Sequence, residues 1–414
     1  MIARFIGERA RRAFSRAVTF EEGGHPELPA AAEGRGRLLY LHIPFCEKLC
    51  PYCSFNRVVF VEPIARSYFR ALRKEIGLYR ERGYDFSGIY VGGGTPTVQI
   101  DELKETLLLA RASFRIREIS VETNPNHLTD RNIQALREAG VNRLSVGVQS
   151  FDDGLLRAMD RYEKYGSGSE IVGRLKDTLG SFDTLNADMI FNFATQTTEI
   201  LDRDLETLTD IAIDQITYYP LMVSDSTREK IHRTLGPVDM KREEEFYRRI
   251  TARLTPPYHF SSVWCFSRKP SMIDEYVVGY DEYAGLGSGS IGYMDGTCYA
   301  NTFSIEDYIR RLDAGEIPLM AARRFGIREQ VQYDFLMRLF GTKMNPADLK
   351  KKYGDRLGRH LWPMVFAFWT AGALRLSEGR LSLTPRGRFL WVVMMREFFV
   401  AVNNFRDFCR GYDI

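Results

Sequence analysis

Short apolar segments alternate with longer amphipathic segments over the first half of the chain. The apolar segments have the length of buried strands and lie at residues 38–43, 88–91, 118–121, 143–148, 185–190 and 215–219. Strands that alternate with helices form βαβ units, and these build a parallel sheet. The pattern therefore predicts an α/β fold, a partial parallel (β/α) barrel, with functional residues at the carboxyl ends of its strands.

The pattern becomes helical after about residue 325. Within this part, alternating leucines on either side of Glu378 and Gly379 predict a β-hairpin. Helices followed by a hairpin suggest a small winged-helix-like domain. We therefore expect an N-terminal segment and linker (1–36), a catalytic domain (37–325) and a C-terminal helical domain (326–414).

Two segments could contact an apolar ligand or a lipid surface. Residues 388–402 are apolar nearly all round and could wall a pocket for an apolar ligand, although such a stripe is more often plain core. Residues 1–14 combine arginines with an apolar helical face, which could rest on an anionic bilayer or dock on the protein.

Composition limits the class of protein. The 414 residues carry 57 basic and 54 acidic side chains, and this near balance does not suggest a nucleic-acid partner. The chain has no long apolar run and no signal-peptide pattern, so we expect a cytoplasmic protein, with peripheral contact to the inner face of the membrane left open. Three of the six cysteines lie within eight positions, which favours a metal site over a disulfide framework.

Cys46, Cys50 and Cys53 follow the first predicted strand. Three thiolates can hold a [4Fe-4S] cluster and leave one iron without a protein ligand. Structural zinc is the alternative, but it normally has four protein ligands and no fourth cysteine lies nearby. His42 is close in sequence, although it precedes the loop on the strand.

The cysteine segment and four later motifs resemble the radical S-adenosylmethionine (SAM) superfamily, specifically its oxygen-independent coproporphyrinogen III oxidase-like branch. The motifs occur in that branch's order over roughly residues 38–300, at residues 40–46, 92–97, 122–125, 140–151 and 285–289. The resemblance implies a [4Fe-4S] cluster whose open iron binds SAM. It also implies an electron donor such as flavodoxin or ferredoxin.

The branch is known to hold two SAM molecules, and its contact positions carry over to single residues here. For the first molecule they are Tyr40, Gly93, Glu122 and Ile291. For the second they are Tyr52, Gly94, Thr95, Gln149, Arg161, Asp188 and Met222. The charged members suit the ammonium, carboxylate and ribose of the ligand, although each taken singly is more often a helix cap or a surface ion pair, and only their shared register favours the ligand. Glycines at 92–94 would let the backbone approach the ligand closely.

One position departs from the oxidase, which usually has a fourth cysteine where Phe55 stands. Relatives with an aromatic residue there include haem chaperones and class C methyltransferases. Residues 46–55, 161–166 and 262–268 read most like menaquinone C8-methyltransferases, which predicts radical methylation of an sp² carbon, C8 of the lipid quinone menaquinone. In that mechanism a radical made from one SAM activates the methyl group of the other.

The base that removes the ring proton stays open among a pocket tyrosine, Cys265 and a cofactor group. A haem chaperone and a coproporphyrinogen oxidase-like or haem-degrading enzyme remain the alternatives.

Overall fold

The structure is a computed structural model that describes residues 7–8, 11, 27–31, 36–53, 55–225, 227–236, 239–270 and 275–412. Most of the N-terminal segment considered for membrane contact lies outside these residues. The described part of it includes Gly7 and Arg11, and the side chain of Arg11 donates a hydrogen bond to Glu397 near the C-terminus.

All six predicted strands are present and run parallel in one sheet. They are β1 (Arg37–Ile43), β4 (Gly88–Gly93), β5 (Glu118–Thr123), β6 (Arg143–Gln149), β7 (Thr184–Phe191) and β8 (Gln215–Pro220), and they neighbour one another in that order. Leu39, Ile89 and Leu144 are fully buried, as expected for a parallel sheet covered on both faces. The predicted partial barrel is confirmed.

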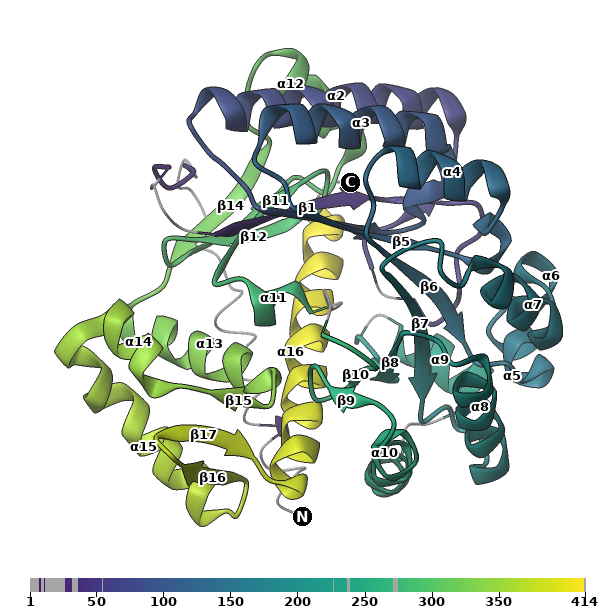
Figure 1. The fold of residues 1–414 in the computed structure, drawn as a ribbon. Helices are drawn as coiled ribbons and strands as arrows, with labels where there is room; N and C mark the ends of the chain where they lie inside the picture. Colours follow the sequence, from purple (N-terminus) through teal and green to yellow (C-terminus); the bar gives the residue numbers. More distant parts are fainter. Residues whose placement is uncertain are drawn as a thin grey trace.

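Amphipathic helices cover the outer face of this sheet (Figure 1). α2 buries Tyr68, Leu72 and Ile76 on one side, and a capping box at Ser167 starts α7. The helices of this part are α2 (Glu62–Glu81), α3 (Ile100–Ser113), α4 (Asp130–Glu138), α5 (Asp153–Ala158), α6 (Tyr162–Tyr165), α7 (Gly168–Thr178), α8 (Thr198–Ile211), α9 (Arg228–Leu235) and α10 (Met240–Leu254), with short 3₁₀ turns η1 (Pro96–Gln99) and η2 (Pro125–His127).

The sheet extends beyond the predicted strands at both edges. β11 (Glu282–Leu286) lies parallel to β1, and β12 (Ile291–Met294), β13 (Thr297–Asn301) and β14 (Leu319–Arg324) continue antiparallel from it. At the other edge β10 (Cys265–Ser267) and β9 (His259–Phe260) follow β8 antiparallel. Two short helices belong to this part, α11 (Tyr276–Gly279) and α12 (Ile305–Asp313). The sheet is therefore mixed.

The C-terminal part is helical and contains the predicted hairpin. Its strands β16 (Leu374–Ser377) and β17 (Arg380–Leu383) are joined by Glu378 and Gly379, which have φ values of 51° and 74°. Positive φ at both positions is the geometry of a type I′ turn. The remaining elements are α13 (Ile327–Phe340), β15 (Lys343–Met344), α14 (Pro346–Tyr353), η3 (Gly354–Arg356), α15 (Leu357–Thr370) and α16 (Pro385–Tyr412). The division into domains at residue 325 stays a prediction.

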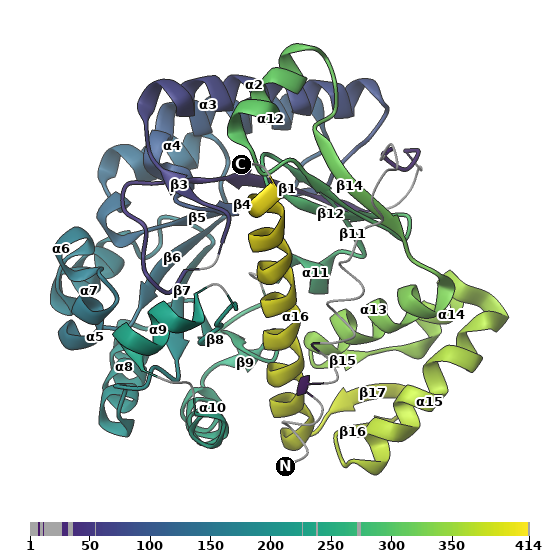
Figure 2. The same ribbon diagram turned by 180° about the vertical axis from the view of Figure 1, so that it is seen from behind.

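The long helix α16 runs between this C-terminal part and the sheet (Figures 1 and 2). Met395 and Val392 are fully buried, and the indole of Trp391 donates a hydrogen bond of 3.0 Å to the carbonyl of Leu336 in α13. Among the described helices, α16 included, none combines the length and the apolar character needed to cross a bilayer. α16 thus joins the two parts of the chain through its packing.

Candidate functional site

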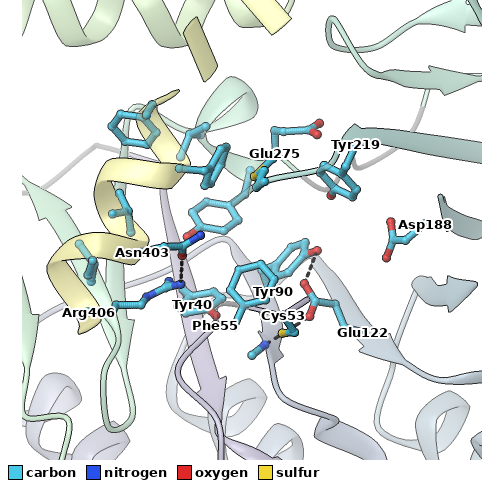
Figure 3. Close-up of a pocket in the computed structure, with 18 of the residues that line it drawn as sticks. Tyr40, Cys53, Phe55, Tyr90, Glu122, Asp188, Tyr219, Glu275, Asn403 and Arg406 are labelled. Carbon is cyan, nitrogen blue, oxygen red and sulfur yellow. Dashed lines mark hydrogen bonds between the residues drawn. The ribbon is translucent and has the colours of Figure 1, made fainter. Parts of the chain in front are cut away.

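A cavity of about 770 Å³ opens between the carboxyl ends of the barrel strands and the C-terminal helices (Figure 3). Every residue that the sequence assigned to the cluster or to SAM lines this one cavity: Cys46, Cys50, Cys53, Tyr40, Tyr52, Gly93, Gly94, Thr95, Glu122, Gln149, Arg161, Asp188, Met222 and Ile291. Residues far apart in the sequence thus meet in one place. Their individual roles stay predictions.

A short pair of parallel strands joins the two ends of the cysteine loop. Cys46 ends β2 (Phe45–Cys46), which pairs with β3 (Val58–Val59). Arg57 donates hydrogen bonds to the backbone carbonyls of Cys50 and Cys53, and the bond to Cys50 is 2.7 Å long. These two hydrogen bonds stabilise the loop, and the Arg57 guanidinium lies beside the thiols.

The thiols face polar hydrogen-bond donors. The Thr95 hydroxyl lies 3.6 Å from the sulfur of Cys46, and Nη1 of Arg161 lies 3.7 Å from the sulfur of Cys50. Burial raises the pKa of Cys46 to about 11, and the Thr95 hydrogen bond partly offsets this. Donors and cations around buried sulfur atoms suit thiolates that carry negative charge in a cluster.

The arrangement fits a cluster better than one zinc ion. Within the described residues, no group of three or more His, Cys, Asp or Glu side chains is arranged to hold a metal ion. The thiolates of a four-iron cluster bind different iron atoms, so they need not converge on one point. His42 is not placed to bind a metal ion, because both of its ring nitrogens are engaged, one with the Tyr40 hydroxyl (2.9 Å) and the other with the Asn56 carbonyl (2.8 Å). Burial lowers the pKa of His42 to about 3.

The glycine-rich turn after β4 holds the cysteine loop in place. The backbone N–H groups of Gly94 and Thr95 donate bonds of 2.7 Å to the carbonyls of Ile43 and Phe45. A Cβ atom at position 94 would lie 2.6 Å from the Phe45 oxygen, which excludes a side chain. The backbone of the turn therefore approaches the backbone of the cysteine loop closely, as glycine permits. The turn positions the cluster loop and also lines the cavity.

Glu122 and Arg161 carry opposite charges into the cavity from different strands and loops. Glu122 accepts bonds from the Tyr90 hydroxyl (3.0 Å) and the Gly93 N–H (3.2 Å). Arg161 is buried and donates to the Tyr52 hydroxyl at 3.3 Å. Burial opposes the charge of Arg161, but nearby Tyr52 and Cys50 outweigh this effect and its pKa is raised.

Two further polar residues enter the cavity from β6 and β7. Asp188 accepts bonds from Ser145 (2.8 Å) and Asn186 (2.9 Å). Gln149 has φ 75°, and the register between β6 and β7 shifts between Gly147 and Gln149. Such a bulge redirects a side chain, and a non-glycine residue in this conformation is often functional.

The opposite wall is apolar and comes from helices that the motifs do not mark. α13 contributes Phe335 and Leu336, α15 contributes Met364 and Phe368, and α16 contributes Trp391, Met394, Phe398, Phe399 and Val402. The expected role of residues 388–402 as a pocket wall is thus confirmed in position, and the same helix also packs as core. The nature of the ligand stays open.

Tyr276 and Arg406 complete the site, and sequence reasoning missed both of them. Tyr276 of α11 stacks on Tyr40 with ring centroids 5.6 Å apart and lies 5.3 Å from Tyr90. Arg406 of α16 donates a 2.9 Å bond to Asn403 and lies 5.3 Å from the ring of Phe55 (Figure 3). Burial lowers the pKa of Arg406.

One candidate from the sequence lies elsewhere. Cys265, considered as a base, is fully buried in β10 and does not line the cavity. Its sulfur lies 3.7 Å from the Thr217 hydroxyl instead. β10 lies between β8 and β9, and all three of its residues are buried, so tyrosines of the cavity are the better-placed groups.

Comparison with known proteins supports the radical SAM assignment. Residues 40–177 match the model of the radical SAM superfamily. The chain is 28% identical to the haem chaperone HemW of Bacillus subtilis over 85% of this chain and 96% of the relative. It is 30% identical to the HemW of Lactococcus lactis over 66% of this chain and 73% of the relative.

The solved structure of coproporphyrinogen III oxidase HemN from Escherichia coli has the same fold. The match has a TM-score of 0.75 at 22% identity and covers 93% of both chains. Oxygen-independent coproporphyrinogen III oxidases are also among the relatives found by sequence. The finer likeness expected to menaquinone C8-methyltransferases is not supported by these relatives.

Proposed function

Because the chain belongs to the radical SAM superfamily, in the branch that contains haem chaperones and oxygen-independent coproporphyrinogen III oxidases, we propose that it is a radical SAM enzyme acting on a large, flat ring substrate. One observation carries the proposal. A single cavity joins the three cysteines to the apolar wall of α13, α15 and α16. A ring bound on that wall lies in the same space as the cluster site.

Cys46, Cys50 and Cys53 would hold the cluster, with Thr95 and Arg161 donating to the sulfur atoms. When bound, the cluster supplies the electron that cleaves SAM and so starts radical chemistry. The part played by the protein is to hold the loop through Arg57 and to keep the thiolates among donors.

SAM would occupy the polar side of the cavity. Glu122 offers a carboxylate to its ammonium group, while Arg161 and Asp188 suit a carboxylate and ribose hydroxyls. All three project from the barrel side of the cavity. A second SAM molecule is part of this proposal, and its support is that the residues assigned to both molecules share one space.

The ring class we favour first is a haem-type tetrapyrrole. The similar relatives support it, since they are haem chaperones and coproporphyrinogen oxidases by name. The wall supports it as well, because aromatic and methionine side chains suit a flat apolar ring.

A neutral quinone ring is the second candidate, with methyl transfer as the reaction, and the charges of the lining favour it. The cavity is lined by the cations Lys48, Arg57, Arg161 and Arg406 and by the carboxylates Glu122, Asp188, Glu275 and Glu329. This balance leaves no surplus of cations for a substrate with several carboxylates. The lining in the described residues also lacks histidine, a common axial ligand of haem iron.

One experiment separates the candidates. Reduced, cluster-reconstituted protein is incubated anaerobically with SAM and, in separate arms, haem, coproporphyrinogen III or menaquinone. Ring-dependent 5′-deoxyadenosine supports the enzyme proposal, and the arm that yields a modified ring identifies the substrate. A methylated ring with S-adenosylhomocysteine identifies methyl transfer.

Tight haem binding with no product in any arm would overturn the enzyme proposal and indicate a chaperone. The Cys53→Ala variant serves as the control in every arm, because it retains the apolar wall but loses one cluster ligand.

A further inference from the structure

The outer face of α15 exposes three large aromatic side chains. Trp362, Phe366 and Trp369 are 48%, 64% and 56% exposed, and their spacing of four and three residues places them on one side of the helix. Leu376 of the adjacent hairpin is 53% exposed. Aromatic side chains normally bury most of their surface, and clustered exposed ones mark an interaction site.

Arginines lie close in sequence to these aromatic residues. Arg359, Arg375, Arg380 and Arg386 are all exposed, and Glu378 is the sole acidic residue between positions 357 and 386. No ion pair in the described part of the chain involves any of the four arginines. Arg359 precedes Trp362 by one helical turn on α15, and Arg375 and Arg380 lie on the hairpin that carries Leu376, so this part of the chain combines exposed apolar and basic side chains.

We propose that this face, Trp362, Phe366, Trp369 and Leu376 with their four arginines, docks on an anionic lipid bilayer. Tryptophan and phenylalanine partition into the membrane interface, and arginines are attracted to anionic headgroups. A second copy of the chain fits less well, because a symmetric dimer would set arginine against arginine. The positive charge of this surface therefore favours an anionic bilayer over a second copy of the chain.

The inner face of the same helix lines the cavity. Met364 and Phe368 contribute to the apolar wall, and the Phe368 ring lies 5.9 Å from Phe335 of α13 and 4.9 Å from Trp391 of α16. Docking would place the apolar wall about one helix diameter from the lipid, roughly 10 Å. This link to the substrate, but not the docking itself, rests on the function proposed above.

Vesicle flotation of the full-length, cluster-loaded protein tests the proposal. The probes are phosphatidylcholine vesicles with and without phosphatidylglycerol. We expect binding to the anionic vesicles that weakens as salt is added. Replacing Trp362, Phe366 and Trp369 with serine should weaken this binding about tenfold or more, since the buried apolar area is lost. The variant Arg375→Glu with Arg380→Glu should weaken it and remove the preference for anionic lipid.

A matched control replaces the exposed Ile64 of α2 and Leu108 of α3 with serine, and this variant should bind as the native protein does. Equal binding by the native and aromatic variants would overturn the proposal, as would a concentration-dependent dimer in light scattering that the same serine changes abolish. SAM cleavage without vesicles should be unchanged in the aromatic variant. Loss of vesicle binding is therefore distinguishable from failure of the proposed enzyme activity.

Discussion

The two walls of the cavity differ in chemistry and in origin. The barrel wall comes from strand ends and presents Glu122, Asp188, Arg161 and the cysteine loop, each held by hydrogen bonds to neighbouring residues. The helical wall comes from α13, α15 and α16 and is mostly apolar, with Glu329 and Gln332 of α13 and Asn403 and Arg406 of α16 as its polar residues. The first wall is built to hold a charged cofactor in a fixed position, and the second to accommodate a ring.

This difference assigns reaction type and substrate choice to different parts of the chain. Polar groups in fixed geometry suit chemistry shared with the relatives, because the cofactor is the same. Apolar contacts are less directional, so a helical wall can change its ligand with few substitutions. Substitutions on the barrel wall should therefore abolish cofactor chemistry, whereas those on the helical wall should alter the substrate.

The largest effect is expected from Cys53→Ala. Loss of one cluster ligand should lower 5′-deoxyadenosine formation by about a thousandfold or more. Iron content and SAM cleavage measure the change. The matched control is Cys265→Ala, which removes a buried thiol outside the cavity and should retain both. If Cys53→Ala kept full SAM cleavage, the barrel wall would not be the cofactor wall.

The next effect tests the carboxylate on β5. Glu122→Gln removes a charge-assisted contact with the ligand and should weaken SAM binding by about tenfold to a hundredfold at unchanged iron content. Equilibrium dialysis measures the affinity. Glu118→Gln on the same strand is the control, because its carboxylate bonds to Tyr280 instead. Equal affinities for all three proteins would contradict the assignment of Glu122.

The barrel wall could be predicted from sequence because its signals are local. Apolar runs revealed the six parallel strands, and the cysteine spacing with the ordered motifs assigned fourteen residues that prove to share one cavity. The hairpin at Glu378 and Gly379 was also local, since turn residues between alternating leucines suffice to predict it. In each case neighbouring residues determine the conformation.

The helical wall could be predicted only in part because tertiary packing creates it. The apolar character of residues 388–402 was evident, but Arg406 and Tyr276 enter the cavity through contacts with Phe55 and Tyr40 that are distant in sequence. β11 to β14 were missed because they are short and follow no βαβ rhythm. Cys265 was misplaced as a base candidate for a similar reason, since the side of β10 that it faces depends on the register with β8 and β9.

A smaller effect is expected from the one cation on the helical wall. Arg406→Met should weaken binding of the ring substrate by about tenfold, because the guanidinium beside Phe55 can donate to an oxygen on the ring. SAM cleavage in the absence of the ring should stay unchanged. Arg406→Lys, which keeps the charge, should restore part of the affinity. Equal loss of SAM binding and ring binding would place Arg406 with the cofactor wall instead.

The smallest effect on activity is expected from Glu75, which supports the barrel wall from behind. This buried carboxyl on α2 accepts a 2.9 Å bond from the Gly287 N–H and a 2.8 Å bond from Asn301, and burial raises its pKa to about 7 from 4.5. Between these two values the folded state holds a proton that the unfolded state has lost. The contribution of Glu75 to the free energy of unfolding is therefore full at low pH and declines as pH rises from 4.5 to 7, by at most about 1.4 kcal/mol per pH unit.

Glu75→Gln should flatten this dependence of the free energy of unfolding on pH, measured by urea unfolding from pH 4.5 to 7, and leave SAM cleavage unchanged. Glu105→Gln, at an exposed carboxylate, should keep the native slope. Parallel curves for the native protein and Glu75→Gln would show that Glu75 does not titrate between pH 4.5 and 7, and that the carboxylate supporting the barrel wall is ionised in this range.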